Sequence, residues 1–250
     1  MMQWALRAHS KMWGGQESDY LIPLVDRMRE VWESGRRREK LHWLSGQNVD
    51  WDEFLKHIGL GLNTLYMSRS RGLRWVEQTP EYTMHLDNIV KLFPDAQFLF
   101  MVRDGREVVH SLRNFVNPVE HEAACRIWRN FIRAGLRFAD SESGSQLLQV
   151  SYRRAVEDTK GEMARIFEFI GEPYEQACIE FITSKTPINS SFGGTASAEP
   201  RWASWSLEDK KTFDGVAGDL LASLGFEADN SWITDAPVSL PDGVPVEGSS

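Results

Sequence analysis

The 250-residue sequence has few cysteines and no long apolar run. Its two cysteines, Cys125 and Cys178, each lie in an amphipathic helical pattern, so we expect free buried thiols in a reducing compartment. No apolar run approaches the ~20 residues of a membrane span. The N-terminus lacks the basic region, apolar core and cleavage site of a signal peptide. We therefore expect a cytoplasmic protein without a membrane segment.

The motifs of several common enzyme classes are also missing. The sequence contains no G-x-x-x-x-G-K-[ST] loop, no G-x-G-x-x-G turn and no G-x-S-x-G elbow. Its Cys and His residues do not show the spacing of metal ligands, so we expect no metal. The sequence therefore lacks the usual motifs of enzymes that hydrolyse ATP, transfer a hydride or use a serine nucleophile for hydrolysis.

Basic residues are absent from the C-terminal part of the chain. The formal net charge is −8, but no Lys or Arg follows Lys211, whereas residues 1–211 hold 28 basic and 29 acidic residues. The nearly neutral body does not indicate a nucleic-acid partner. From Ala228 the composition turns to Asp, Ser, Pro and Gly. We expect one domain over residues 1–227 and an acidic tail over residues 228–250.

Strand-like and helix-like segments alternate along the chain. Strands are predicted at residues 73–77, 98–102 and 146–152, and residues 9–15 are interpreted as a turn-rich connector. Helical spacing is found over residues 1–8, 20–32, 51–67, 80–93, 120–139 and 162–170. This alternation predicts an α/β fold, a mostly parallel central sheet with helices on both faces.

The stretch around residue 103 carries the clearest candidate site. The apolar run Phe98–Val102 predicts a buried strand, and it leads through Arg103-Asp104-Gly105 into a predicted helix that contains Ser111. Ligands of open α/β sheets bind at the carboxyl ends of strands, and the guanidinium of Arg103 suits a phosphate there. An equally open alternative is a turn ion pair at Arg103-Asp104 and a surface role for Ser111.

The segment from Phe93 to Ser111 resembles the 3′-phosphate-binding segment of sulfotransferases that use 3′-phosphoadenosine 5′-phosphosulfate (PAPS). The resemblance is strongest to the tyrosylprotein sulfotransferases. It implies a P-loop-type three-layer sandwich with PAPS as co-substrate and no metal. It also implies that Arg103 and Ser111 bind the 3′-phosphate.

Other segments extend the resemblance. Residues 9–18, followed by Leu21-Ile22-Pro23, are similar to the family segment with the general base, which implies this role for Glu17. The resemblance further implies an adenosine contact for Tyr152 and a loop over the 3′-phosphate with Ser190, Ser191 and Arg201. Without it, the favoured interpretation of Glu17 is a surface acid in a loop, and Tyr152 can be an aromatic residue that caps the core at a strand end.

The implied reaction is in-line transfer of a sulfuryl group from PAPS to an acceptor hydroxyl, with Glu17 as general base. The sequence does not distinguish a peptide tyrosine from a carbohydrate, a lipid or a small alcohol as acceptor. It does not determine the oligomeric state either.

The sequence departs from the resembled family in two places. The 5′-phosphosulfate loop and its strand would precede the first helix, but the sequence begins at Met1 with that helix. We favour a start recorded too late over a partial sulfotransferase. Gln78 stands where tyrosylprotein sulfotransferases have a Lys, which puts peptide-tyrosine specificity in doubt.

Two other functions remain open. One is a catalytically weak or inactive module that binds a nucleotide or a partner, and the other is a relative of P-loop kinases.

Overall fold

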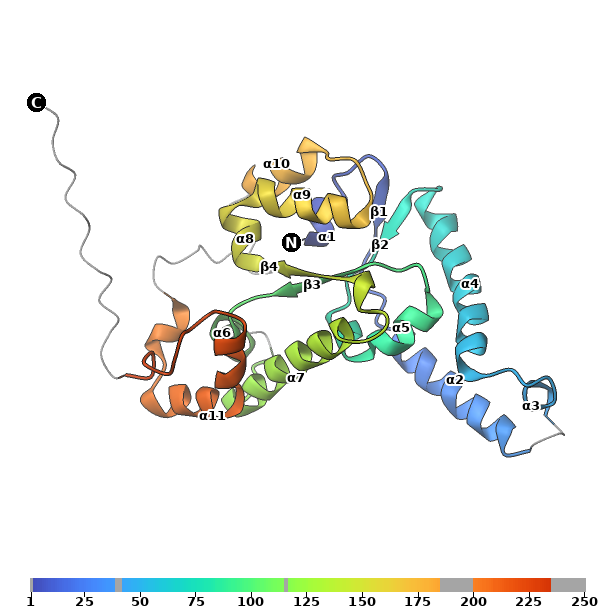
Figure 1. The fold of residues 1–250 in the computed structure, drawn as a ribbon, viewed down its shortest axis with the longest axis horizontal. Helices are drawn as coiled ribbons and strands as arrows, with labels where there is room; N and C mark the ends of the chain where they lie inside the picture. The colour runs from blue at the N-terminus through green and yellow to red at the C-terminus, as the bar shows by residue number, and fades with distance from the viewer. Residues whose placement is uncertain (1, 39–41, 115–116, 185–199, 235–250) are drawn as a thin grey trace, which may run out of the picture. The chain divides into compact units, whose positions relative to one another are not determined.

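The computed structural model describes residues 2–38, 42–114, 117–184 and 200–234 (Figure 1). These residues divide into two compact units. Unit 1 contains the described residues of the ranges 2–103 and 130–184, and unit 2 contains those of the ranges 104–129 and 200–234. The chain passes from one unit to the other directly after Arg103 and again within a long helix, α7.

Unit 1 contains the strands. Its elements are α1 Met2–Leu6, β1 Met12–Gly14, α2 Leu21–Arg36, α3 Trp43–Gly46, α4 Trp51–Ser70, β2 Arg74–Val76, a 3-10 helix Pro80–His85, α5 Leu86–Leu92, β3 Phe98–Val102, a 3-10 turn Gly144–Gln146, β4 Leu147–Ser151, α8 Tyr152–Glu157, α9 Thr159–Ile170 and α10 Gln176–Ser184. The described part of unit 2 contains α6 Gly105–Arg113, a 3-10 helix Arg201–Ser204 and α11 Leu207–Ser223. Helix α7, His121–Ala139, spans the boundary.

The strands pair in parallel, as predicted. Strand β1 pairs with β2, from Met12 opposite Arg74 to Gly14 opposite Val76. Strand β3 pairs with β4, from Phe98 opposite Leu147 to Val102 opposite Ser151. The three strands predicted from the sequence are confirmed within one or two residues. The α/β class is confirmed as well.

Two features of the sheet differ from the prediction. The interpretation of residues 9–15 as a connector was wrong, because Met12–Gly14 forms β1; three residues are too few to show an alternating pattern. Among the described residues the strands also form two separate ladders rather than one sheet. Side chains connect the two ladders instead: Arg74 of β2 donates to Gln97, just before β3, and to the carbonyl of Ile170.

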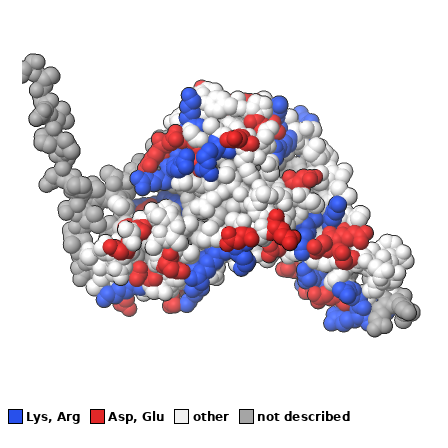
Figure 2. Space-filling view, in the orientation of Figure 1, with Lys and Arg blue, Asp and Glu red and all other residues white. Residues whose placement is uncertain are grey.

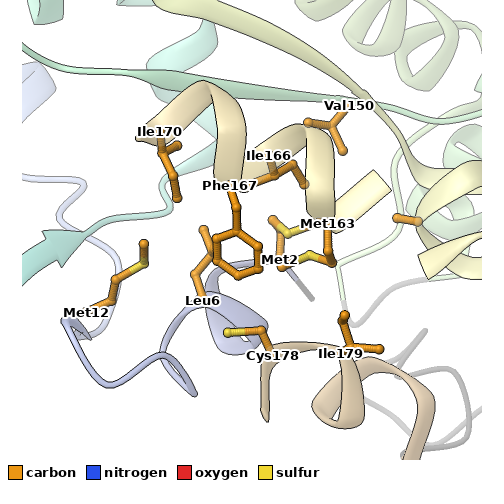
Figure 3. Packing of buried hydrophobic residues seen from close by; sticks show 11 residues of the cluster. Met2, Leu6, Met12, Val150, Met163, Ile166, Phe167, Ile170, Cys178 and Ile179 are labelled. Carbon is orange, nitrogen blue, oxygen red and sulfur yellow. The ribbon is translucent and has the colours of Figure 1, made fainter. Parts of the chain in front are cut away.

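The first hydrophobic core lies between β4 and three helices of unit 1. In Figure 1, α9 and α10 lie beside each other with α1, and α9 packs on β4. Figure 3 shows apolar side chains from α1, α9 and α10 pointing toward one another, among them Leu6, Phe167 and Cys178. Helix α9 begins at a cap, where the Asp158 carboxylate accepts from the Gly161 N–H at 3.0 Å. This core anchors β4 from the helix side.

The second core of unit 1 lies between α2, α4 and α5. Its buried members are Leu21, Val25, Trp32, Trp51, Leu55, Ile89, Leu92 and Phe93. Helix α4 approaches α5 closely at Gly59, where an added Cβ would lie 1.7 Å from the Leu92 carbonyl oxygen. Any larger residue at position 59 would therefore push the two helices apart.

Both cysteines are free and buried, as the sequence predicted. Burial raises the pKa of Cys125 to about 12 and that of Cys178 to about 11. Since the thiolate is the reactive form, neither side chain is set up as a nucleophile near neutral pH.

Unit 2 is built around a buried cation. The Arg106 side chain is 3% exposed, and its Nη2 lies 2.7 Å from Asp104 Oδ2. Its Nη1 pairs with Glu227. Its guanidinium carbon lies 3.9 Å from the ring centroid of Trp202 and 5.0 Å from that of Trp232. Arg106 thus joins the start of α6 to two distant parts of the C-terminal segment.

The packed part of unit 2 extends past residue 227, where we expected the tail to begin. Trp232 is buried, and its ring lies against Trp202 and Phe213. The Lys210 ammonium donates to the Thr234 carbonyl at 2.9 Å. Residues 235–250 lie outside the described residues.

Charged side chains are mixed on the face shown in Figure 2. Lys and Arg lie among Asp and Glu there, with no large area of one sign. In the parts of the chain that the structure describes, no helix is long and apolar enough to cross a membrane.

We predict that Arg106→Ala lowers the free energy of unfolding of unit 2 by about 3–5 kcal/mol, because it leaves two carboxylates without their buried cation. The matched control is Arg126→Ala. Arg126 is an exposed arginine that pairs with Glu122 one turn away on α7, and we expect it to contribute less than ~1 kcal/mol. Urea unfolding followed by tryptophan fluorescence measures both. Equal effects of the two substitutions would contradict the role assigned to Arg106.

Candidate active site

Parallel pairing brings Arg103 and Tyr152 together. Val102 and Ser151 are the last paired residues of β3 and β4, so the next residues leave the ladder at the same edge. There the Arg103 guanidinium carbon lies 4.6 Å from the centroid of the Tyr152 ring. This is the distance of a cation–π contact. Two residues predicted from the sequence as donor contacts therefore form one structural feature in unit 1.

The turn after Arg103 fixes the start of α6. The Asp104 carboxylate caps the helix by accepting the Arg106 N–H at 2.9 Å. Gly105 is buried, and a Cβ there would lie 2.6 Å from the Trp128 ring. The Asp-Gly pair following Arg103 is thus explained by capping and packing. The alternative ion pair between Arg103 and Asp104 is not needed to explain Asp104, which pairs with Arg106.

Arg201 lies against the same helix that carries Ser111. The Arg201 backbone N–H and Nε donate to the two oxygens of Glu107 at 3.0 and 3.1 Å. Ser111 follows Glu107 by four residues on α6, so the two side chains lie on the same helix face. Arg201 Nη2 lies 3.1 Å from Glu107 Oε2 but has no hydrogen-bond partner of acceptable geometry among the described residues. Its N–H groups could bind an anionic oxygen.

His110 lies on the same helix, among these charged side chains. Burial lowers the pKa of His110, and the positive charges of Arg201 and Arg113 lower it further. His110 is therefore neutral near pH 7, and the cationic charge of the face comes from the arginines. Arg113 pairs with Asp209 at 3.0 Å and Arg201 Nη2 lies 3.1 Å from Glu107 Oε2, so each of these arginines already has a carboxylate partner.

The predicted donor contacts belong to different units. Arg103 and Tyr152 lie in unit 1, and Ser111 and Arg201 lie in unit 2. The remaining two predicted contacts, Ser190 and Ser191, lie outside the described residues. The structure thus shows one contact between predicted site residues, Arg103 with Tyr152, and the complete set of donor contacts stays a prediction.

Glu17 lies in the loop between β1 and α2. Its side chain is exposed, whereas the neighbouring Ser18 is buried. Gly14 and Val76 are the last paired residues of β1 and β2, so the loop with Glu17 leaves the ladder at the same edge as Glu77. An exposed carboxylate at the carboxyl edge of a parallel ladder is in a position to meet a ligand.

The sequence analysis missed two residues beside Glu17. The Ser18 N–H donates to Glu77 Oε1 at 2.7 Å and to Thr79 Oγ1 at 2.9 Å. Burial raises the pKa of Glu77, and the negative charge of Glu17 adds to this. The sequence signal for Glu77 was a carboxylate at the last position of the strand predicted over residues 73–77, next to Gln78.

A metal site is not evident in the described ranges. No three His, Cys, Asp or Glu side chains gather there in a way that could hold a metal ion.

Curated relatives of this chain are named as sulfotransferases. It is 23% identical to a putative protein-tyrosine sulfotransferase of Caenorhabditis briggsae, over 76% of this chain and 68% of that protein. It is 25% identical to a putative protein-tyrosine sulfotransferase of Caenorhabditis elegans, over 58% of each chain. A third, protein-tyrosine sulfotransferase 2 of Gallus gallus, is 31% identical over 45% of this chain and 30% of that one. The chain thus spans only part of these proteins.

Solved structures show the same fold. The sulfotransferase domain of the Synechococcus PCC 7002 olefin synthase superposes with a TM-score of 0.54 and 19% identity, over 86% of this chain and 89% of the domain. The sulfotransferase domain from the curacin biosynthetic pathway gives a TM-score of 0.55 and 15% identity, over 90% and 93%. A sequence model of the sulfotransferase family matches residues 1–176. The chain, with its Arg103 turn at the edge of a parallel ladder, therefore belongs to the sulfotransferase family.

Proposed function

We propose that this protein transfers a sulfuryl group from PAPS to an acceptor hydroxyl, with Glu17 as general base. The observation that carries the proposal is the contact of Arg103 with Tyr152 at the carboxyl edge of the β3–β4 ladder. A guanidinium held by an aromatic ring, at the point where the next helix begins, is suited to a phosphate with an attached purine nucleoside.

In this proposal three residues bind the 3′-phosphate of the donor. Arg103 and Arg201 supply cations, and Ser111 supplies a hydroxyl on the face of α6. Arg201 Nη2 is ion-paired with Glu107 at 3.1 Å but makes no hydrogen bond of acceptable geometry among the described residues, which supports its assignment as the second cation. Charge-assisted hydrogen bonds from guanidinium groups would favour a donor with a 3′-phosphate over ATP, which has none. The roles of Ser190 and Ser191 stay part of the proposal.

The chemistry assigned to Glu17 is removal of one proton. As the acceptor oxygen forms its bond to sulfur, the Glu17 carboxylate takes the acceptor's hydroxyl proton. The bond from sulfur to the 5′-phosphate oxygen breaks, and its electron pair leaves with adenosine 3′,5′-bisphosphate. The protein's contribution is mainly position and charge, as in phosphoryl transfer.

The acceptor is a hydroxyl compound in this proposal. Three of the relatives are named protein-tyrosine sulfotransferases, so a peptide tyrosine is the first acceptor to test. Gln78 is uncharged and exposed, so it supplies no cation for an acidic peptide. A neutral phenol such as 2-naphthol is therefore the second acceptor to test.

The first prediction concerns the donor site. We expect the protein to bind adenosine 3′,5′-bisphosphate in calorimetric titration, and Arg103→Ala to weaken this binding about 10–100-fold, because a charge-assisted hydrogen bond contributes about 1.5–3 kcal/mol. The control is Arg27→Ala, an exposed arginine that pairs with Glu30 on α2. Equal affinities of the wild type and Arg103→Ala would refute the donor site.

The second prediction concerns the base. Glu17→Gln keeps the shape of the side chain but cannot take a proton, so we expect kcat to fall about 10²–10⁴-fold. Affinity for adenosine 3′,5′-bisphosphate should not change. Transfer of radiolabelled sulfate to a tyrosine peptide and to 2-naphthol measures the rate. Tight bisphosphate binding without turnover in the wild type would instead identify a binding module.

A further inference from the structure

The loop with Glu17 is held by residues that follow the neighbouring strand. Because Gly14 pairs with Val76, the chain segments after β1 and β2 leave the ladder side by side. Glu17 and Ser18 come from the first segment, and Glu77 and Thr79 come from the second. Hydrogen bonds join Ser18 to Glu77 and Thr79, which are 59 and 61 residues away in sequence.

Both backbone polar groups of Ser18, the residue after Glu17, are hydrogen-bonded. The Ser18 N–H donates to Glu77 Oε1 and Thr79 Oγ1, and the Thr79 hydroxyl itself donates to Glu77 Oε1 at 2.6 Å. The Ser18 carbonyl accepts from the Tyr82 hydroxyl and from the Leu21 N–H. Ser18 is 7% exposed and Thr79 is 5% exposed. These contacts are therefore shielded from competing water.

The hydrogen bonds of the Ser18 N–H fix the backbone next to Glu17. The Ser18 N–H belongs to the same planar peptide group as the Glu17 carbonyl, so its hydrogen bonds fix the plane that follows the Glu17 Cα. The Glu17 side chain is exposed and makes none of these contacts itself. The loop is thus held by its backbone, and the carboxylate is left available to a ligand.

The Thr79 side chain does not cap its own helix. It precedes Pro80 at the start of a 3-10 helix, where a threonine hydroxyl ordinarily accepts a backbone N–H of that helix. The structure shows no such cap at Thr79. Its hydroxyl instead joins Ser18 to Glu77.

Burial of the Glu77 carboxylate beside the loop with Glu17 is energetically unfavourable by itself. Glu77 is half-buried. Burial raises the pKa of Glu77, and the negative charge of Glu17 raises it further. Burial also raises the pKa of Tyr82, and the negative charge of Glu77 adds to that effect. A carboxylate shielded from water beside another acid is unfavourable unless its hydrogen bonds compensate. Its hydrogen bonds go to the Ser18 and Thr79 groups that hold the loop.

We propose that Glu77 and Thr79 are positioning residues that hold the Ser18 peptide group and thereby aim the Glu17 carboxylate at the acceptor hydroxyl. The proposal rests on the proposed function, because it assigns a purpose to the position of Glu17. Neither residue needs to touch the acceptor. Their effect is on the geometry of proton removal, to which rates respond steeply.

The experiment compares Glu77→Ala, Glu77→Gln and Thr79→Val with the control Glu81→Ala, an exposed acid in the same 3-10 helix. Amide hydrogen exchange measures protection of the Ser18 N–H, and amides of the β3–β4 ladder report whether each variant is folded. Steady-state kinetics give kcat and the acceptor KM, and calorimetry gives bisphosphate affinity. Thr79→Val keeps the shape of the side chain if Glu77→Ala disturbs folding.

In Glu77→Ala we expect Ser18 exchange to accelerate at least about 10-fold, since a buried N–H loses its main acceptor. We expect kcat to fall about 100-fold through misplacement of Glu17, with unchanged bisphosphate affinity. Glu77→Gln keeps an acceptor oxygen, so Ser18 protection and kcat should stay within about 5-fold of wild type. Thr79→Val should show a smaller loss in both, and Glu81→Ala none.

Three results would overturn the proposal. Unchanged Ser18 protection in folded Glu77→Ala would show that Glu77 does not hold the loop. An equal loss of kcat in Glu77→Gln and Glu77→Ala, with Ser18 still protected in the former, would make the Glu77 carboxylate itself a proton carrier. The third result is a wild type that binds bisphosphate but transfers no sulfuryl group, together with loss of Ser18 N–H protection in Glu77→Ala. The hydrogen bond between Ser18 and Glu77 would then have a structural role only. This last result refutes the proposed function separately from the donor site, which the Arg103→Ala titration tests.

Discussion

Parallel pairing of short strands is the constraint on which this structure depends. In a parallel ladder both chains leave at the same edge, so residues that follow the last pair become neighbours whatever their separation in sequence. Arg103 meets Tyr152 after the Val102 and Ser151 pair. Ser18 meets Glu77 after the Gly14 and Val76 pair. The same physical rule thus builds the proposed donor contact of unit 1 and the support of the proposed base.

Buried charge is treated differently in the two units. In unit 2 the Arg106 cation is paired with Asp104 and Glu227 and covered by Trp202. Since Arg201 precedes Trp202, this packing also sets Arg201 beside Glu107 on α6. In unit 1 the Glu77 carboxylate receives neutral donors and lies near a second acid. The paired Arg106 cation stabilises the fold of unit 2. The half-buried Glu77 carboxylate is unfavourable for stability, but it fixes the position of the loop with Glu17.

Family membership and local geometry support different parts of the conclusion. The match over residues 1–176 and the superposed domains show a sulfotransferase fold. They do not assign roles to individual side chains, because identity to those domains is below 20%. The proposed roles rest on the contacts of Arg103, Arg201 and Ser18.

Local patterns in the sequence determined the α/β class, the strands β2, β3 and β4, the Arg103 turn and the free cysteines. Runs of apolar residues, helical spacing and capping residues are short-range signals, and each of these features depends on neighbours in the chain. Strand β1 was missed because three residues carry no period, and the packing of Trp232 was missed because polar residues surround it in sequence. Only the tertiary structure showed that Thr79 binds Ser18 instead of capping its own helix, and that Glu77 lies beside Glu17. Those contacts join residues about 60 positions apart, and their energies depend on burial, which no local pattern encodes.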